Sequence, residues 1–264
     1  MWLALHFLTT SNGFSPMLSL LSQGSSHILR SWNGRAILIA SDVEQRQNKI
    51  QHILSKVHHT SSYLGQESNG NDSTMDSAFR MLNATQFLQD SYGKPCWSHA
   101  ATDSPGGVFI LHSKRAFKFG LRSILFHIVP GRIMASLLVG KANDEDTAAS
   151  SLLTINVHNE GLSAEQVKSF ARWLAPYLRL AVAEPGRHCV VAAGDINQIE
   201  FHPVGFSLGK GEKVDLAPSS AHHPRLWQSL LRDLLETKPD GFSHYCQANH
   251  TLNSLTNIYI SLPS

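Results

Sequence analysis

The most informative chemical feature of the chain is a carboxylate and an amide two residues apart at the end of an apolar run. Residues 189–197 read Cys-Val-Val-Ala-Ala-Gly-Asp-Ile-Asn, and Val190–Ala193 predicts a buried strand that breaks at Gly194. Residues two apart on an extended backbone point to the same face, so Asp195 and Asn197 should project together. Such a carboxylate can position a water or a metal ion, and the amide can hydrogen-bond a phosphate oxygen. An ordinary turn is the alternative interpretation.

Four further segments strengthen this signal. They read His-Ile-Leu-Arg-Ser-Trp-Asn-Gly-Arg-Ala-Ile-Leu (27–38), Tyr-Leu-Gly-Gln-Glu-Ser-Asn-Gly (63–70), Leu-Thr-Ile-Asn-Val-His-Asn (153–159) and Ser-Leu-Thr-Asn-Ile-Tyr-Ile (254–260). In this order, together with residues 189–197, they resemble the endonuclease/exonuclease/phosphatase superfamily over most of residues 27–261. The likeness is greatest to the endonuclease domains of non-LTR retroelements, which are related to apurinic endonucleases.

The resemblance implies a role for each motif residue. Glu67 would bind a single Mg²⁺, a hard cation that takes oxygen ligands. Asn33 would support the metal and the network around the attacking water. Asp195 would position or deprotonate that water, and Asn197 would help to hold the phosphate. The alternatives are a solvated Glu67 at a strand end and a turn at Asn33 before Gly34.

Several positions depart from the family pattern. Arg35 stands where repair-type relatives carry an acidic residue near the metal, so we expect Mg²⁺ binding to be weak or lost. Ile155 stands where many relatives carry a tyrosine that hydrogen-bonds the scissile phosphate. His158 or Asn159 can take part of that role, although a strand-end histidine without function is an equal alternative. Asn257 stands where relatives carry an aspartate that orients the histidine of a final Ser-Asp-His motif, and no such motif follows.

The elements around these motifs alternate between strands and helices. Ser163–Gln166 reads as a capping box that starts a helix, which Pro176 should kink or end. Two strand-rich halves that each carry helices predict two mixed sheets packed face to face with helices outside, an α/β fold. The resemblance implies the same four-layer sandwich, lacking its last strand. Strands are expected over 27–33, 62–66, 108–111, 132–139, 151–157, 190–193 and 257–261, and helices over 42–58, 163–175 and 224–237.

Composition limits the partners and the compartment. The chain has 264 residues, 42% of them hydrophobic and 16% charged, so one domain can bury a sizeable core. A net charge of +2 gives little electrostatic support for nucleic acid, although a basic cluster at residues 114–122 could touch phosphate. That cluster reads equally well as a solvated face. Three widely spaced cysteines without a CxxC motif argue against disulfides and zinc, and they indicate an intracellular protein of the nucleus or cytoplasm.

The expected organisation is one domain over residues 26–264 after a leader or poorly ordered segment over residues 1–25. The apolar run near the start is too short and interrupted for a membrane span, and no membrane association is expected. Residue Cys189, within an apolar strand, should be a small core residue.

The resulting hypothesis is a Mg²⁺-dependent phosphodiester hydrolase that nicks DNA, weakened by the departures at Arg35, Ile155 and Asn257. Two alternatives stay open. The first is a catalytically inactive remnant of a retroelement endonuclease domain. The second is a phosphoester phosphatase of the same superfamily, which the wording of the 27–38 and 153–159 segments makes the less favoured of the two. The oligomeric state is not indicated by the sequence.

Overall fold

The structure is a computed structural model. It describes residues 2–4, 9–10, 13–14, 17–22, 25–33, 44, 48, 62–66, 96–98, 106–114, 122–140, 151–185, 187–196, 204–207, 210–215, 223–237, 244–246, 251–253 and 256–261. Residues 68–77 and 141–149 lie outside this set. So does the predicted helix over 42–58, apart from Glu44 and Asn48, which are both helical.

The first of the two large sheets has six strands in the order β1-β4-β5-β6-β8-β7. Strands β5 and β6 are parallel, and the other neighbours are antiparallel. The predicted strand over 62–66 is confirmed residue for residue as β6. The strands are β1 (Trp2–Ala4), β4 (Met17–Ser22), β5 (Ser25–Asn33), β6 (Ser62–Gln66), β7 (Cys96–Ser98) and β8 (Val108–His112).

Residues 1–25, expected as a leader or poorly ordered segment, include strands that pair into the first sheet. Strand β4 pairs with β5 along its whole length, from Met17 opposite Arg30 to Ser22 opposite Ser25. Strand β1 pairs with β4 in turn. The apolar run Met-Leu-Ser-Leu-Leu within β4 suits a sheet strand, and it is too short for a membrane span.

The second large sheet has the order β15-β18-β12-β11-β10-β9, with β11 and β12 parallel and all other pairs antiparallel. The outer side of β18, which a missing last strand would leave unpaired, is covered over three residues by β15. The strands are β9 (Arg122–Val129), β10 (Ile133–Val139), β11 (Ser151–His158), β12 (His188–Asp195), β15 (Leu235–Thr237) and β18 (Thr256–Ile260). Of these, β9 and β15 were not predicted.

Helix α6 (Ala164–Ala183) connects β11 to the parallel β12. Its predicted capping box is confirmed, because Ser163 Oγ accepts from the Gln166 amide and the Gln166 side chain accepts from the Ser163 amide. The prediction that the helix ends near Pro176 is wrong, since the helix runs seven residues further. Pro176 is exposed, so water can satisfy the Arg172 carbonyl that loses its intrahelical partner.

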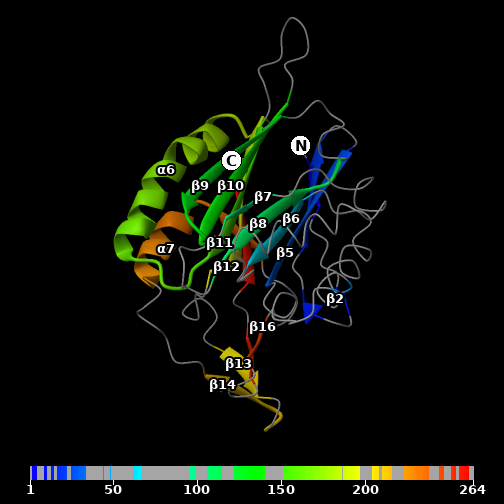
Figure 1. The fold of residues 1–264 in the computed structure, drawn as a ribbon, viewed down its shortest axis with the longest axis vertical. Coiled ribbons are helices and arrows are strands. Elements are labelled where there is room, and N and C mark those ends of the chain that lie inside the picture. The colour runs from blue at the N-terminus through cyan, green and yellow to red at the C-terminus, as the bar shows by residue number, and fades with distance from the viewer. Residues whose placement is uncertain are drawn as a thin grey trace, which may run out of the picture.

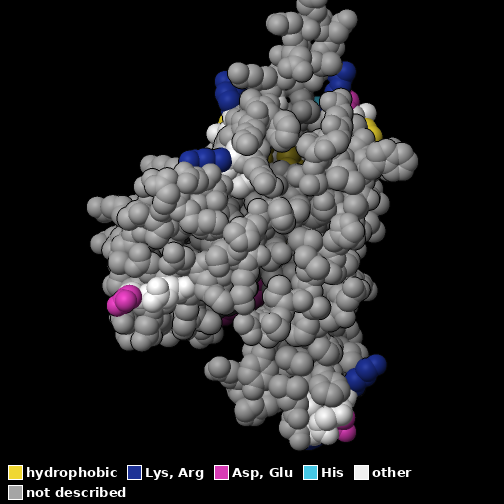
Figure 2. Space-filling view, turned by 90° about the vertical axis from the view of Figure 1, so that its right-hand side faces the viewer, with side chains coloured by type: hydrophobic (Ala, Val, Ile, Leu, Met, Phe, Trp, Pro, Cys, Tyr) yellow, Lys and Arg dark blue, Asp and Glu magenta, His cyan; other side chains and the backbone are white. Residues whose placement is uncertain are grey.

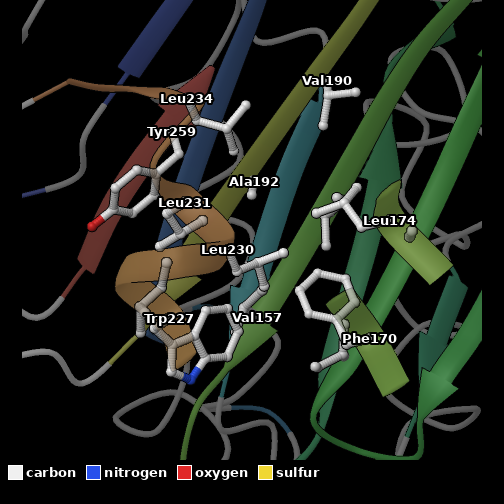
Figure 3. Close-up of a cluster of buried hydrophobic side chains, with 14 of the residues drawn as sticks. Val157, Phe170, Leu174, Val190, Ala192, Trp227, Leu230, Leu231, Leu234 and Tyr259 are labelled. Carbon is white, nitrogen blue, oxygen red and sulfur yellow. The ribbon is translucent and has the colours of Figure 1, made fainter. Parts of the chain in front are cut away.

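Helix α7 (Pro224–Leu231) is shorter than the predicted 224–237 helix. Residues Leu235–Thr237 instead form strand β15, because tertiary pairing with β18 outweighs their helical spacing. In Figure 3, side chains of both helices, among them Phe170, Leu174, Trp227 and Leu230, point at the β-sheet. Phe170 and Trp227 are fully buried there, with their ring centroids 5.8 Å apart.

The three described layers are α6 with α7, the second sheet, and the first sheet (Figure 1). One core lies between the helices and the second sheet, and another lies between the two sheets. The inter-sheet core also carries a polar link. His112 Nδ1 is 2.7 Å from Ser62 Oγ, and its Nε2 is 2.8 Å from Ser136 Oγ on the opposite sheet.

The α/β fold of two packed mixed sheets with helices is therefore confirmed. A smaller four-stranded sheet extends beyond one end of the sandwich (Figure 1) and has the order β14-β13-β17-β16. Its strands are β13 (Val204–Ser207), β14 (Glu212–Asp215), β16 (His244–Cys246) and β17 (Thr251–Asn253). Among the described helices, none is long and apolar enough to cross a bilayer.

Candidate active site

The ends of parallel strands from both sheets meet at one edge of the sandwich. In the first sheet, β5 and β6 end side by side with Asn33 paired to Gln66. In the second sheet, β11 and β12 end side by side with His158 paired to Asp195. Gln66 Nε2 donates to Oδ1 of Asn156, two residues before the end of β11, at 2.6 Å. Since this bond spans the two sheets, the ends of all four strands lie at the same edge.

Asn156 fastens the two sheets together at this edge. Its Nδ2 donates to two backbone carbonyls of the first sheet, Gly65 O at 2.8 Å and Phe109 O at 2.9 Å, while its Oδ1 accepts from Gln66. Asn156 and Gln66 are both completely buried. Hydrogen bonds at buried positions are electrostatically stronger than in water. The Asn156 side chain therefore holds the ends of β6 and β11 in a fixed position relative to each other.

Three polar side chains gather at this edge, from the turn between β9 and β10 and from the ends of β11 and β12, and we call Arg132, His158 and Asp195 the charged row. Ile155 and Val157 lie in the helix-side core, so the alternation of β11 turns His158 toward the first sheet. His158 pairs with Asp195 in the parallel register, and its amide donates to Arg132 O at 2.8 Å. The ring nitrogen Nδ1 of His158 lies 2.9 Å from Arg132 Nη1.

The three side chains of the charged row are almost completely buried. His158 and Asp195 are each 2% exposed, and Arg132 is 8% exposed. Burying an ionised group is costly unless it is paired or hydrogen-bonded, so a cation and a carboxylate at the same strand ends indicate a site that is built for charge.

Two neighbours hold Asp195 in place at the end of β12. The Asn159 amide donates to Asp195 O at 2.7 Å, and Asn159 Nδ2 donates to Ile196 O at 2.7 Å. Gly194, with φ +140°, lets β12 approach β11 so closely that a Cβ there would overlap the carbonyl oxygen of Val157. The position of the Asp195 carboxylate therefore depends on backbone contacts on both sides of it.

Arg132 is held by the turn between β9 and β10 and by the two glycines that precede β8. Gly107 N donates to Gly131 O at 2.9 Å, and Gly131 N donates to Ser98 Oγ at 3.0 Å. A Cβ at Gly106 would lie 2.9 Å from Arg132 Nη1. The guanidinium fits against the first sheet because residue 106 has no side chain.

Comparison with known proteins identifies this architecture. No protein-family model and no curated protein sequence matches the chain. Solved structures do match. They include an endonuclease/exonuclease/phosphatase family protein from Bacteroides thetaiotaomicron, at 16% identity and TM-score 0.52, covering 91% of this chain and 84% of that one.

Two further matches have a TM-score of 0.50. The 3' phosphatase NExo from Neisseria, solved bound to product DNA hairpin, is 17% identical and covers 88% of this chain and 86% of that one. Truncated TDP2 from Caenorhabditis elegans is 16% identical and covers 89% of this chain and 84% of that one. The chain has the endonuclease/exonuclease/phosphatase fold. The resemblance seen in the sequence is therefore confirmed for the fold, because matches at 16–17% sequence identity show a shared fold.

Within the endonuclease/exonuclease/phosphatase fold, the structure brings together part of the predicted site. His158 and Asp195 lie directly side by side. For Asn33 the backbone is described, and it ends β5 next to Gln66. For Asn257 the backbone pairs with Gly194, one step from the pair formed by Asp195 and Thr256. Glu67, Asn197 and Arg35 lie outside the described residues.

One sequence-based alignment is not supported by the structure. Ile155, expected at the position of a phosphate-binding tyrosine, lies fully buried in the helix-side core, three residues before the end of β11. The side chain at the end of the strand, next to Asp195, belongs to His158. The imidazole can donate or accept a hydrogen bond, so the loss inferred from the aliphatic Ile155 does not apply at this edge.

Sequence reasoning missed Arg132, Gln66 and Asn156. The available signals were the Gly-Arg pair in a turn and a polar side chain at every second position of an otherwise apolar strand, namely Thr154, Asn156 and His158. Polar residues at that spacing face one side of a sheet, and in a buried strand they need partners.

Metal ligands and basic patches are sparse in the described part of the chain. No group of three or more His, Cys, Asp or Glu side chains that could hold a metal ion occurs there. Of the predicted basic cluster, Lys114 and Arg122 are described, and both are exposed. On the face seen in Figure 2, the described Lys and Arg side chains stand apart from one another. Cys189 is a buried free thiol, as expected, and burial raises its pKa to about 11.

Proposed function

We propose that the chain hydrolyses phosphodiester bonds, with DNA as its substrate. The observation that carries this proposal is the charged row, which places a buried carboxylate, an imidazole and a guanidinium side by side at the strand ends of an endonuclease/exonuclease/phosphatase fold. A function must be argued from its site, and this site pairs an acceptor for water with donors for an anion. The resemblance to retroelement endonucleases supports DNA as the substrate.

Each member of the charged row has a part in the reaction. Asp195 accepts a hydrogen bond from the attacking water and takes its proton as the new oxygen–phosphorus bond forms. His158 lies on the phosphate side, where its donor favours the negative charge that develops on the phosphoryl oxygens, and Arg132 hydrogen-bonds the His158 ring. The bond to the leaving oxygen breaks, and that oxygen takes its proton from water, which is a reason to expect slow turnover.

The donor chemistry at this edge suits Mg²⁺. Asn33 ends β5 beside Gln66, and Glu67 follows Gln66 directly, so the chain supplies carboxylate and amide oxygens, the ligands that a hard cation takes. Glu67 would hold the ion with support from Asn33, and the ion would supply positive charge to the phosphate. The positive charge of the buried Arg132 guanidinium at the same edge repels Mg²⁺ and so weakens its binding.

Titration calorimetry with MgCl₂ tests the metal proposal. We expect affinity no tighter than the millimolar range, because Arg132 and Arg35 offset the charge of Glu67 and Asp195. Glu67→Gln should remove the binding that remains. A wild-type site of low micromolar affinity would contradict this balance of charges.

Relaxation of supercoiled plasmid in the presence of Mg²⁺ tests the activity. We expect slow nicking by the wild type and none by Asp195→Ala, since the residue that accepts the proton is then gone; such groups typically contribute about 10²–10⁴-fold. The matched control is Asp233→Ala, which removes an exposed carboxylate beyond helix α7.

The outcome separates the alternatives. Nicking that survives Asp195→Ala would place the activity elsewhere or in a contaminant. A wild type that cleaves neither plasmid nor bis-p-nitrophenyl phosphate would identify a catalytically inactive remnant. Cleavage of p-nitrophenyl phosphate alone, lost in Asp195→Ala, would identify a phosphomonoester phosphatase.

A further inference from the structure

We propose that Arg132 is a positioning residue that fixes the imidazole of His158 as its Nε2–H tautomer, so that His158 donates a hydrogen bond to a phosphate oxygen instead of accepting a proton. The phosphate part of this inference rests on the proposed function. The tautomer part rests on geometry alone.

The direction of the bond between the two side chains follows from their chemistry. Arg132 Nη1 and His158 Nδ1 are 2.9 Å apart, a normal hydrogen-bond distance. A guanidinium carries only donors and stays protonated in proteins, so Arg132 must donate and Nδ1 must accept. A nitrogen that accepts has no proton, and the proton of the neutral ring is therefore on Nε2.

The surroundings of Arg132 leave its guanidinium little freedom to turn away. The His158 amide donates to Arg132 O, which ties the two backbones together. Gly106 lies against the guanidinium, and the bonds from Gly107 to Gly131 and from Gly131 to Ser98 hold the turn against the first sheet. These contacts come from strands β7 and β11, from the two glycines before β8 and from the turn itself, which is more support than a solvent-exposed arginine would have.

The fixed tautomer gives Asp195 and His158 different roles, one toward water and the other toward phosphate. Asp195, on the next strand, is an acceptor when ionised and suits the water. An imidazole with Nε2–H offers a donor, which attracts a phosphate oxygen, whereas a bare Nε2 lone pair would repel it. Arg132 thus determines which partner His158 prefers without having to touch the substrate itself.

Nitrogen-15 NMR of histidine-labelled protein tests the tautomer directly. The chain has 15 histidines, so the His158 ring is assigned by the signals that disappear in His158→Gln. We expect the wild type to show a proton on Nε2 and an accepting lone pair on Nδ1. In Arg132→Met the Nδ1 signal should move to that of a nitrogen without a donor, whereas Arg132→Lys should keep an intermediate value. A proton on Nδ1 in the wild type overturns the inference.

Plasmid nicking tests the consequence. Gln carries its amide nitrogen about where imidazole carries Nε2, and Asn does not. His158→Gln should therefore retain more activity than His158→Asn, for which we expect a loss of about 10²-fold, typical of one preorganised donor. Equal losses in these two variants overturn the donor role.

A double-mutant cycle shows whether Arg132 acts through His158. Arg132→Met alone should reduce nicking about 10²-fold, but it should add little in the His158→Gln background, because the effects of coupled residues are not additive. Additive effects would show that Arg132 acts on the substrate directly, and they would overturn its assignment as a positioning residue. Arg172→Met, which removes an exposed arginine on helix α6, is the matched control.

Two further points keep the test decisive. If Arg132→Met does not fold, Gly106→Ala displaces the guanidinium without removing its charge, and it should shift the Nδ1 signal and slow nicking in the same direction. A wild type that cleaves no phosphoester overturns the proposed function and the donor role with it. An active wild type whose His158 ring is insensitive to Arg132→Met overturns the inference and leaves the proposed function standing.

Discussion

Replacement of Gly194 by alanine should damage both the stability of the protein and its site. Gly194 sits at φ +140°, where side chains with a Cβ are strained. A Cβ there would overlap Val157 O and lie 2.9 Å from both the carbonyl carbon and the nitrogen of Val157. These are backbone atoms of the paired strand β11, so no side-chain rotation can relieve the overlap. Strand β12 has to move away from β11, and Asp195 is the next residue along.

The size of the effect can be worked from two contributions. A non-glycine residue in an unfavourable backbone region costs about 1–3 kcal/mol. Overpacking against fixed atoms costs about 1–3 kcal/mol more. We therefore expect Gly194→Ala to lower the free energy of unfolding by about 2–6 kcal/mol, and each 1 kcal/mol corresponds to about 2–4 °C in Tm for a chain of this size.

The matched control is Gly161→Ala. Gly161 also has positive φ, at +67°, but a Cβ there meets nothing within 4 Å, so this variant carries the backbone strain without the overlap. Urea unfolding of both variants should show Gly194→Ala to be at least about 1 kcal/mol less stable than Gly161→Ala, the lower bound for overpacking. Equal stability of the two would refute the close approach of β11 and β12 and, with it, our account of how Asp195 is positioned.

Three other predictions concern the buried polar groups. Asn156→Ala removes three hydrogen bonds between the sheets and should lower the free energy of unfolding by about 3 kcal/mol, measured in urea, at about 1 kcal/mol per bond; a loss below 1 kcal/mol would mean that these bonds do not hold the sheets. Thr154→Val should instead stabilise the protein by about 1 kcal/mol, because Thr154 Oγ1 is buried with no hydrogen-bond partner in the described part of the chain, and a lower stability would reveal a partner. Burial raises the Cys189 pKa from 9.0 to about 11, so the folded state holds this proton longer than the unfolded chain does. The stability of the wild type relative to Cys189→Ala should therefore be constant below pH 9 and fall between pH 9 and about 11, by on the order of 2 kcal/mol, and a flat difference would contradict the shift.

The sequence predicted those elements whose signals are local. The capping box at Ser163 and the apolar run Val190–Ala193 each need only neighbours within a few residues, and both were found where expected. Strand β15 was predicted as helix because its pairing with β18 is a tertiary contact that its own residues do not encode. Strand β9 was not predicted because it is partly exposed and its pattern of buried and exposed residues is irregular.

The site was predicted in part for the same reason. Asp195 and His158 stand at strand ends, which a motif can indicate, and the register then placed them side by side. The roles of Arg132 and Asn156 depend on partners that are distant in the chain. Arg132 hydrogen-bonds a ring 26 residues away, and Asn156 hydrogen-bonds a side chain 90 residues away. A single sequence gives the residue types at those positions but not the distances between them.

The 90-residue span of the bond between Gln66 and Asn156 also has a consequence for the order of folding. The charged row is contained in the segment from Arg132 to Asp195, whose strands and helix are consecutive in the chain. The strand that leads to Glu67 belongs to the other sheet, and closing the longer loop costs more entropy. We expect an intermediate in which the second sheet has formed and the first has not yet docked. Such a species would carry His158 and Asp195 in register and remain catalytically silent, so that activity returns only in the slowest phase of refolding.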